Sequence, residues 1–318
     1  MKKILGFLAL GFFTSLLFVS TLDNLWVNHK IFFVVLSFFL IGVIVSFVRE
    51  FLALKPFNQS KVLLSKSLIY DFLAVFVGSI ITYIVSIYGG LGAVVGSALV
   101  GVFAGLFVKP YAVAIFCGSF VGMASPDLLG WLPFIFASLM ASSLFVLAKD
   151  SFNGFGGKLG TIALSSSLLI WVFIRPDFIE GSIFTQNQSF VIVVVAMIAA
   201  LTTYVMNIKL NQGPVVASAF IGLLAGGFFP FIDPVFGTTL AVVGFGASFV
   251  GMSNTLRMPT MLGIMLAGIL FGLIFVYSAP YFGGAGGKLG TIAFSSVLSV
   301  SGIRYLITTL FPQRTCVI

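Results

Sequence analysis

Uninterrupted apolar runs of about 20 residues recur along this chain from one end to the other. A helical run of that length spans about 30 Å of hydrocarbon, because an α-helix rises about 1.5 Å per residue. Only 8% of the 318 residues are charged and 60% are hydrophobic, whereas the surface of a water-soluble domain needs roughly a quarter of its residues charged. The chain is therefore predicted to be an all-α, polytopic integral membrane protein without a separate soluble domain.

Hydropathy predicts about ten full spans and two shorter apolar segments. The spans are expected near residues 4–22, 31–48, 68–88, 90–108, 131–148, 157–175, 190–208, 213–230, 259–278 and 289–310. The shorter segments, 111–129 and 238–256, each begin with a run too short to cross alone and pass through a glycine-rich stretch. Each is expected to be a half-helix joined to a short or tilted span, which gives about 12 crossings in total.

The basic residues indicate an orientation. With the N-terminus in the cytoplasm and about 12 crossings, most lysines and arginines fall on the cytoplasmic face, and Lys30 and Arg175 fall outside. The net charge of +8 thus reflects topology, because the basic residues are scattered singly and form no nucleic-acid-binding stripe. We expect the inner membrane of a bacterium, with both termini cytoplasmic. The first apolar run follows two lysines like a secretory signal, but no small-x-small cleavage site follows, so a retained helix is expected.

Metal and redox chemistry have little support in the composition. The chain contains two cysteines, Cys117 and Cys316, which are too few for a disulfide framework and lack the spacing of a metal site. His29 is the single histidine. The sequence therefore predicts no metal, no cofactor and no enzymatic activity.

Three sequence blocks occur twice and in the same order. GAVVGSALVG at 92–101 resembles GPVVASAFIG at 213–222, SFVGM at 119–123 recurs at 248–252, and GGKLGTIA at 156–163 recurs at 286–293. The halves are predicted as 66–187 and 188–318, after a two-helix extension with a basic linker at 1–65. Five crossings in each half place the second copy upside down relative to the first. Such inverted repeats are typical of transporters, in which paired elements meet near the bilayer midplane.

The duplicated lysines, Lys158 and Lys288, allow two interpretations. A lysine at a helix start can be an interfacial anchor that extends its ammonium group to water. Alternatively, one lysine at each mouth of a shared path would attract an anionic or electron-rich solute, together with the positive helix N-terminus behind it. Thr161 and Thr291, three residues further on, lie on the same helix faces and offer a hydroxyl group. The surrounding glycines are equally consistent with close helix packing.

The second duplicated block supplies further candidates. Ser119 and Ser248 are candidate solute contacts, and Phe120 and Phe249 are candidates for an apolar constriction beside them. With 38 phenylalanines in the chain, a core or lipid-facing position is the alternative for these two. Asp71 lies a few residues into its span, where it is expected to pair with Lys66 or a neighbouring lysine, or else to bind a proton or cation.

The order of these elements resembles the urea transporter family. In that family each half ends in a helix opened by Leu-Pro-x-x-Thr-x-Pro-Phe, and the segment 287–294 fits this motif at Thr291 and Phe294, while 157–164 fits it at Thr161 and Leu164. Both prolines are missing, and lysine replaces the first of them. Residues 118–122 stand where the family has Asn-Gly-Ala-Leu-Val-Gly, and the polar Gln or Glu of its half-helices is absent from 111–117. The resemblance implies the fold, a pore through each protomer and a homotrimer.

These observations predict a transporter or channel for a small polar or anionic solute, with a pore lined by Lys158, Thr161, Lys288 and Thr291. Two alternatives stay open. Flavin-carrying membrane subunits of redox complexes are similar in fold to urea transporters, although residues 159–161 do not match the Ser-Gly-Ala-Thr type of flavin attachment site. The other alternative is a structural membrane partner that transports nothing.

Overall fold

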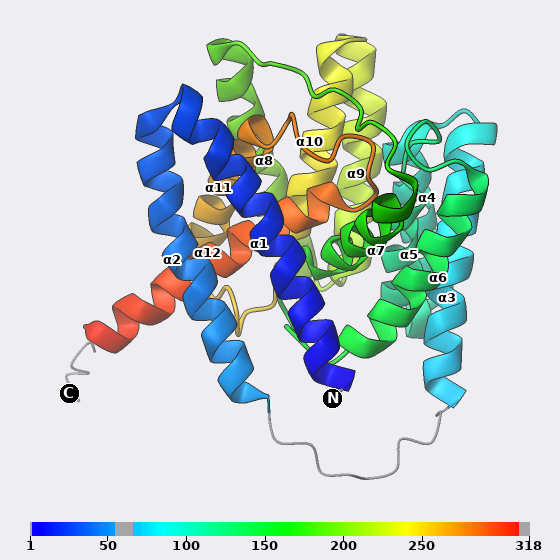
Figure 1. Cartoon of the computed structure of the whole chain (residues 1–318), viewed down its shortest axis with the longest axis horizontal. Helices are drawn as coiled ribbons and strands as arrows, with labels where there is room; N and C mark the ends of the chain where they lie inside the picture. Colours follow the sequence, from blue (N-terminus) through cyan, green and yellow to red (C-terminus); the bar gives the residue numbers. More distant parts are fainter. Residues whose placement is uncertain (1, 55–65, 312–318) are drawn as a thin grey trace.

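The computed structural model describes residues 2–54 and 66–311, and over these ranges the chain forms twelve α-helices (Figure 1). The helices are α1 (Lys2–Asn28), α2 (Lys30–Ala53), α3 (Lys66–Tyr83), α4 (Gly92–Phe107), α5 (Ala112–Val121), α6 (Trp131–Ala148), α7 (Lys158–Ile174), α8 (Gln186–Tyr204), α9 (Pro214–Ile232), α10 (Phe236–Gly251), α11 (Met261–Tyr277) and α12 (Lys288–Leu310). Two π-helical turns, Ile84–Tyr88 and Val205–Lys209, extend α3 and α8. The basic linker predicted after the first two helices falls largely outside the described residues, at 55–65.

Seven helices are long and apolar enough to cross a membrane. They are Ile4–Asn28, Lys30–Ala53, Lys66–Tyr88, Trp131–Ala148, Gln186–Lys209, Pro214–Ile232 and Lys288–Leu310. The remaining five, α4, α5, α7, α10 and α11, are apolar but shorter. The prediction of an all-α, polytopic membrane protein is therefore confirmed. Three of the ten predicted full spans, 90–108, 157–175 and 259–278, correspond instead to the shorter helices α4, α7 and α11.

The two segments predicted to be similar half-helices differ in length. α5 has 10 residues, because Lys109-Pro110-Tyr111 first forms a separate 3-10 turn. The regular helix starts only after this turn, at Ala112. α10 has no such interruption and reaches 16 residues. Of the two, α5 is the one that fits a half-helix.

The two ends of the helix bundle are marked by contacts with α1. Near the start of α1, Gly6 lies against the backbone of Leu147 and Ala148 at the end of α6. Near its other end, Asn24 donates a hydrogen bond of 2.8 Å to Tyr277 O at the end of α11. About 18 helical residues, or roughly 27 Å, separate these two contacts. The C-terminal ends of α6 and α11 therefore lie at opposite ends of the molecule, which we name inner and outer after the predicted orientation.

The inner end also holds two ion pairs. Asp71 of α3 pairs with Lys149, directly after α6, and Glu50 of α2 pairs with Arg257. The lysine partner expected for Asp71 is thus Lys149, whose ammonium group is brought to α3 by the packing of α6 on that helix.

Small residues let the central helices approach closely. A Cβ added at Gly101 in α4 would meet Ala219 of α9, and one added at Gly222 in α9 would meet Ala98 of α4. The contacts are reciprocal, since each glycine faces an alanine of the other helix. Close approach of this kind is the usual role of small residues between membrane helices.

Candidate functional site

Two loops with the same backbone conformation precede α7 and α12. Left-handed φ angles occur at Phe152, Gly154 and Gly157 in the inner loop (149–157), and at Phe282, Gly284 and Gly287 in the outer loop (278–287). Each loop returns the chain from the end of one helix, α6 or α11, to the start of the next. The duplicated sequence block therefore forms a duplicated turn, and Lys158 or Lys288 opens the helix that follows it.

The helices α7 and α12 cross at the duplicated glycines. A Cβ at Gly157 would overlap Gly290 O and the backbone nitrogen of Phe294, and a Cβ at Gly287 would overlap Gly160 O and the backbone nitrogen of Leu164. Gly157 and Gly287 also have φ angles of 84° and 90°, which L-residues rarely adopt. The glycines of the block thus serve close packing.

The two lysines bind the ends of the preceding helices. Lys158 Nζ donates to Lys149 O at 2.9 Å and to Asn153 Oδ1 at 3.3 Å. Lys288 Nζ donates to Ser278 O at 2.8 Å and to Ala279 O at 3.3 Å. A cation at the C-terminus of a helix is favourable because unpaired carbonyl groups concentrate partial negative charge there. Each lysine therefore connects its own helix start to the loop around it.

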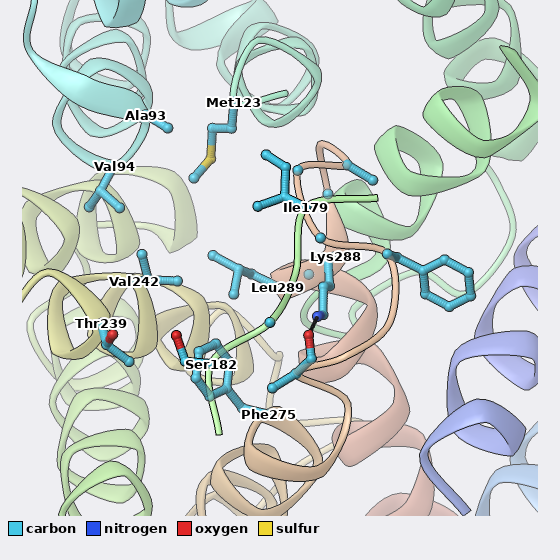
Figure 2. Close-up of a pocket in the computed structure, with 18 of the residues that line it drawn as sticks. Ala93, Val94, Met123, Ile179, Ser182, Thr239, Val242, Phe275, Lys288 and Leu289 are labelled. Atoms are coloured by element: carbon cyan, nitrogen blue, oxygen red, sulfur yellow. Dashed lines mark hydrogen bonds between the residues drawn. The ribbon is translucent and has the colours of Figure 1, made fainter. Parts of the chain in front are cut away.

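Each lysine also lines a cavity. The outer cavity has a volume of about 400 Å³, and its polar lining includes Lys288, Glu180, Ser182 and Thr239. Figure 2 shows Leu289 on the wall of this cavity, pointing toward Val242 of α10, while the Lys288 side chain runs along the wall and its ammonium group bonds to a carbonyl oxygen of the outer loop.

The inner cavity has a volume of about 410 Å³, and its polar lining includes Lys158, Lys149, Asp71 and Asn153. Phe120 and Phe249 line both cavities. The two cavities therefore approach the same pair of rings from the two loops.

Four buried phenylalanines pack together around the two rings that both cavities share. Phe116 and Phe120 come from α5, and Phe245 and Phe249 come from α10; each side chain is at most 2% exposed. The ring centroids of Phe120 and Phe249 are 4.6 Å apart, and each ring also packs on the phenylalanine one turn earlier, at 4.5 and 4.8 Å. We call these residues the phenylalanine cluster. Two of its members, Phe120 and Phe249, line both cavities, whereas Phe116 and Phe245 pack behind them.

Only Phe120 and Phe249 of this cluster are among the predicted site residues. Phe116 and Phe245 each precede a duplicated phenylalanine by four residues, a spacing that places both on one helix face. That spacing, present in both copies, was the available signal.

Ser119 and Ser248 lie away from both cavities. Both are fully buried, and their hydroxyl groups bond to those of Ser97 at 2.8 Å and Ser218 at 2.7 Å. Ser97 and Ser218 belong to the first duplicated block, so these bonds tie α5 to α4 and α10 to α9. The geometry gives these serines a partner within the bundle.

Thr161 and Thr291 lie in the first turns of α7 and α12 and are fully buried. Thr291 Oγ1 donates to Gly287 O at 3.3 Å, and Thr161 Oγ1 has no partner among the described residues. Neither is among the residues that line the two cavities. Of the four residues predicted to line a pore, the lysines reach the cavities and the threonines lie at the helix crossing.

The described part of the chain contains no group of three or more His, Cys, Asp or Glu residues that could hold a metal ion. Cys117 is buried in α5, and its thiol faces Leu159 O at 3.5 Å. Cys316 lies outside the described residues. The polar groups that line the two cavities include the ammonium groups of Lys158 and Lys288 and the carboxylates of Asp71 and Glu180.

Comparisons with protein-family models, with curated proteins and with solved structures found no match to this chain. The resemblance to urea transporters thus stays a prediction from the sequence.

Proposed function

We propose that this chain is a membrane transporter or channel that passes a small polar or anionic solute between two inverted repeats, with a urea-transporter-like fold. One observation carries the proposal. Two cavities of similar volume, each lined by one of the duplicated lysines, reach the same pair of phenylalanine rings. A chain without a path would have no evident need for matching cavities on both sides of one barrier.

The positions of the loops support a path across the membrane. Lys158 binds the end of α6 and Lys288 binds the end of α11, and these ends contact α1 roughly 27 Å apart. The reciprocal contacts of α4 with α9, and of α7 with α12, are those expected when two copies face each other in opposite orientation.

The lysines favour a solute with negative charge or exposed acceptor atoms. An ammonium group has three donors, and the loop acceptors engage two of them in each copy. The N-termini of α7 and α12 add positive partial charge beside each cavity. Volumes near 400 Å³ are at the lower end of the range for ligand pockets, so a small solute fits this size.

The phenylalanine cluster supplies the barrier in this proposal. Apolar constrictions close membrane pathways by excluding water, and they open when their side chains move apart. A solute would enter one cavity, pass between the Phe120 and Phe249 rings when they move apart, and leave through the other cavity.

A flux assay in liposomes tests the proposal. The purified chain would be reconstituted and assayed with urea, formate, acetate and nitrate, using Lys158→Met, Lys288→Met and the double variant. Lys209→Met is the matched control, because Lys209 lies at the exposed end of a π-helical turn and lines neither cavity.

We expect wild-type flux above that of empty liposomes. Anion flux should fall roughly tenfold in Lys158→Met and in Lys288→Met, which is the change expected from losing one charge-assisted hydrogen bond. The control variant should retain its flux. Absence of flux for every solute, or full flux in the double variant, would overturn the proposal.

The closed phenylalanine cluster favours one second candidate, a structural membrane partner that transports nothing. Rings this well packed fill the position where a permanently open pore would run. The same liposome assay separates the two, because a structural partner gives no flux for any solute. The homotrimer implied by the resemblance is a further proposal, which the mass of the purified oligomer would test.

A further inference from the structure

The inner loop is held by an arginine, and within residues 2–54 and 66–311 no arginine makes the same contacts with the outer loop. Arg257, between α10 and α11, donates from Nε to Asn153 O at 3.0 Å, and its guanidinium carbon lies 4.4 Å from the centre of the Phe155 ring. Its two terminal nitrogens bond to the two carboxylate oxygens of Glu50. Arg257 therefore joins α2 of the N-terminal helix pair to the inner loop.

The contact continues from the loop to the cavity lysine. The backbone oxygen of Asn153 accepts the hydrogen bond from Arg257 Nε, and its side-chain oxygen accepts a hydrogen bond of 3.3 Å from Lys158 Nζ. The Glu50 and Arg257 side chains are only 10% and 18% exposed. Bidentate arginine–carboxylate pairs have a fixed geometry, and water and salt screen a shielded pair less than a surface pair. Hydrogen bonds therefore connect Glu50 to Arg257, Arg257 to Asn153, and Asn153 to Lys158.

The outer loop has the shared part of this arrangement without the arginine. At the inner loop, Asn254 N donates to Gly154 O at 3.0 Å; at the outer loop, Ser125 N donates to Gly284 O at 2.9 Å. These donors each lie two residues after a copy of the SFVGM block. Three residues beyond them stand Arg257 in one copy and Leu128 in the other. The two copies therefore differ at this position. Arg257 bonds to the inner loop, which holds Lys158, whereas Leu128 packs against Gly284 of the outer loop, which holds Lys288.

We propose that Glu50 and Arg257 are positioning residues that hold the inner loop and, through Asn153, set the place of Lys158 in the inner cavity. This assigns a role to the N-terminal helix pair, which lies outside the duplicated halves. The effect on transport rests on the proposed function, whereas the effect on Lys158 itself does not. The outer loop, with Lys288, is the internal reference because it shares the backbone and lacks the arginine.

Chemical labelling of the two lysines tests the positioning directly. The full chain in liposomes would be treated with a membrane-permeant amine-acylating reagent, and the acylation rates of Lys158 and Lys288 would be measured by peptide mass spectrometry. The variants are Glu50→Gln, Arg257→Lys and Asn153→Ala. Arg175→Lys is the control, because this arginine bonds within its own turn to Val172 O.

We expect Lys158 to be acylated about fivefold faster in each of the three variants, the change that follows from losing one typical hydrogen bond. Arg257→Lys should match the others, because lysine cannot serve the carboxylate and Asn153 O together while lying flat over a ring. Lys288 should react at the wild-type rate in all of them. Unchanged Lys158 rates, or equal acceleration of both lysines, would overturn the inference.

Solute flux gives the functional readout. If transport is passive, Arg257→Lys should lower inward and outward flux by the same factor at low solute concentration. A passive pathway cannot favour one direction, because the two fluxes must be equal at equilibrium. A selective change in Lys158 labelling in a chain without any flux would support the positioning role and remove the transport proposal. Normal labelling with normal flux in Asn153→Ala would remove the positioning role and leave transport intact.

Discussion

Replacing Gly157 by alanine tests the crossing of α7 and α12, on which the site depends. The residue has a φ angle of 84°, and a left-handed conformation costs an L-residue about 1–2 kcal/mol. The added Cβ would also overlap Gly290 O and the Phe294 nitrogen, which are backbone atoms and cannot rotate away. Overpacking typically costs about 1–3 kcal/mol more. Together these terms predict a loss of about 2–5 kcal/mol in the free energy of unfolding.

Two control glycines separate the terms. Gly90 has a φ angle of 66° and open space around its Cβ position, so Gly90→Ala carries only the conformational cost of about 1–2 kcal/mol. Gly227 lies within α9, with no positive φ angle and no atom near its Cβ position. There an alanine should stabilise the chain by about 0.5–1 kcal/mol, because glycine inside a helix is less favourable.

The assay is unfolding of the detergent-solubilised protein by a graded increase of denaturing detergent, followed by far-ultraviolet circular dichroism. The expected order of stability is Gly227→Ala, wild type, Gly90→Ala and Gly157→Ala, from highest to lowest. If Gly157→Ala unfolds together with Gly90→Ala, the overlap with α12 does not exist. The two helices would then not cross where the structure places them, and the lysines would lose their relation to one path.

Three further outcomes follow from the same geometry. Phe249→Ala should join the two cavities and raise solute flux roughly tenfold, at a cost of about 3 kcal/mol in stability; unchanged flux in liposomes would show that the ring is no barrier. Ser248→Ala should leave the Ser218 hydroxyl short of a partner and cost about 1–2 kcal/mol without changing flux; a selective loss of flux would instead restore the serine as a solute contact. Lys149→Met should weaken stability more than Lys66→Met, as measured by detergent unfolding, because Lys149 pairs with the buried Asp71; equal stability would contradict that pairing.

The helices were largely predictable because apolar runs show how far each helix extends and glycines in the loops show where some of them begin. The predicted spans 157–175 and 289–310 correspond to α7 and α12, which begin at Lys158 and Lys288 after a left-handed glycine. The unequal lengths of α5 and α10 were not predicted. The proline at position 110 was visible in the sequence, but whether it would interrupt a helix or open one depends on how the preceding turn packs.

The site was predictable only in part, because helix periodicity shows which residues share a face but not what covers that face. Lys158 and Thr161 do lie on one face of α7, yet α12 crosses that helix within its first turn. The long lysine side chain reaches past the crossing to the cavity, whereas the short threonine stays inside it. Ser119 was misleading for a related reason, since its partner Ser97 comes from a different duplicated block.

The shared and the unique residues of the two loops have different consequences. Residues present in both copies, the glycines and lysines, produce the same turn, the same ammonium contacts and two matching cavities. A path built only from these would be alike from both ends. Arg257 and Glu50 occur at the inner end, whereas the outer loop is held by backbone bonds from Ser125 and Ile179 and by an exposed hydrogen bond of 3.4 Å from Tyr281 to Asp23. A shielded bidentate ion pair contributes more to holding a loop than an exposed hydrogen bond does. Opening of the path should therefore begin at the outer loop, beside Lys288, with the inner loop remaining in place.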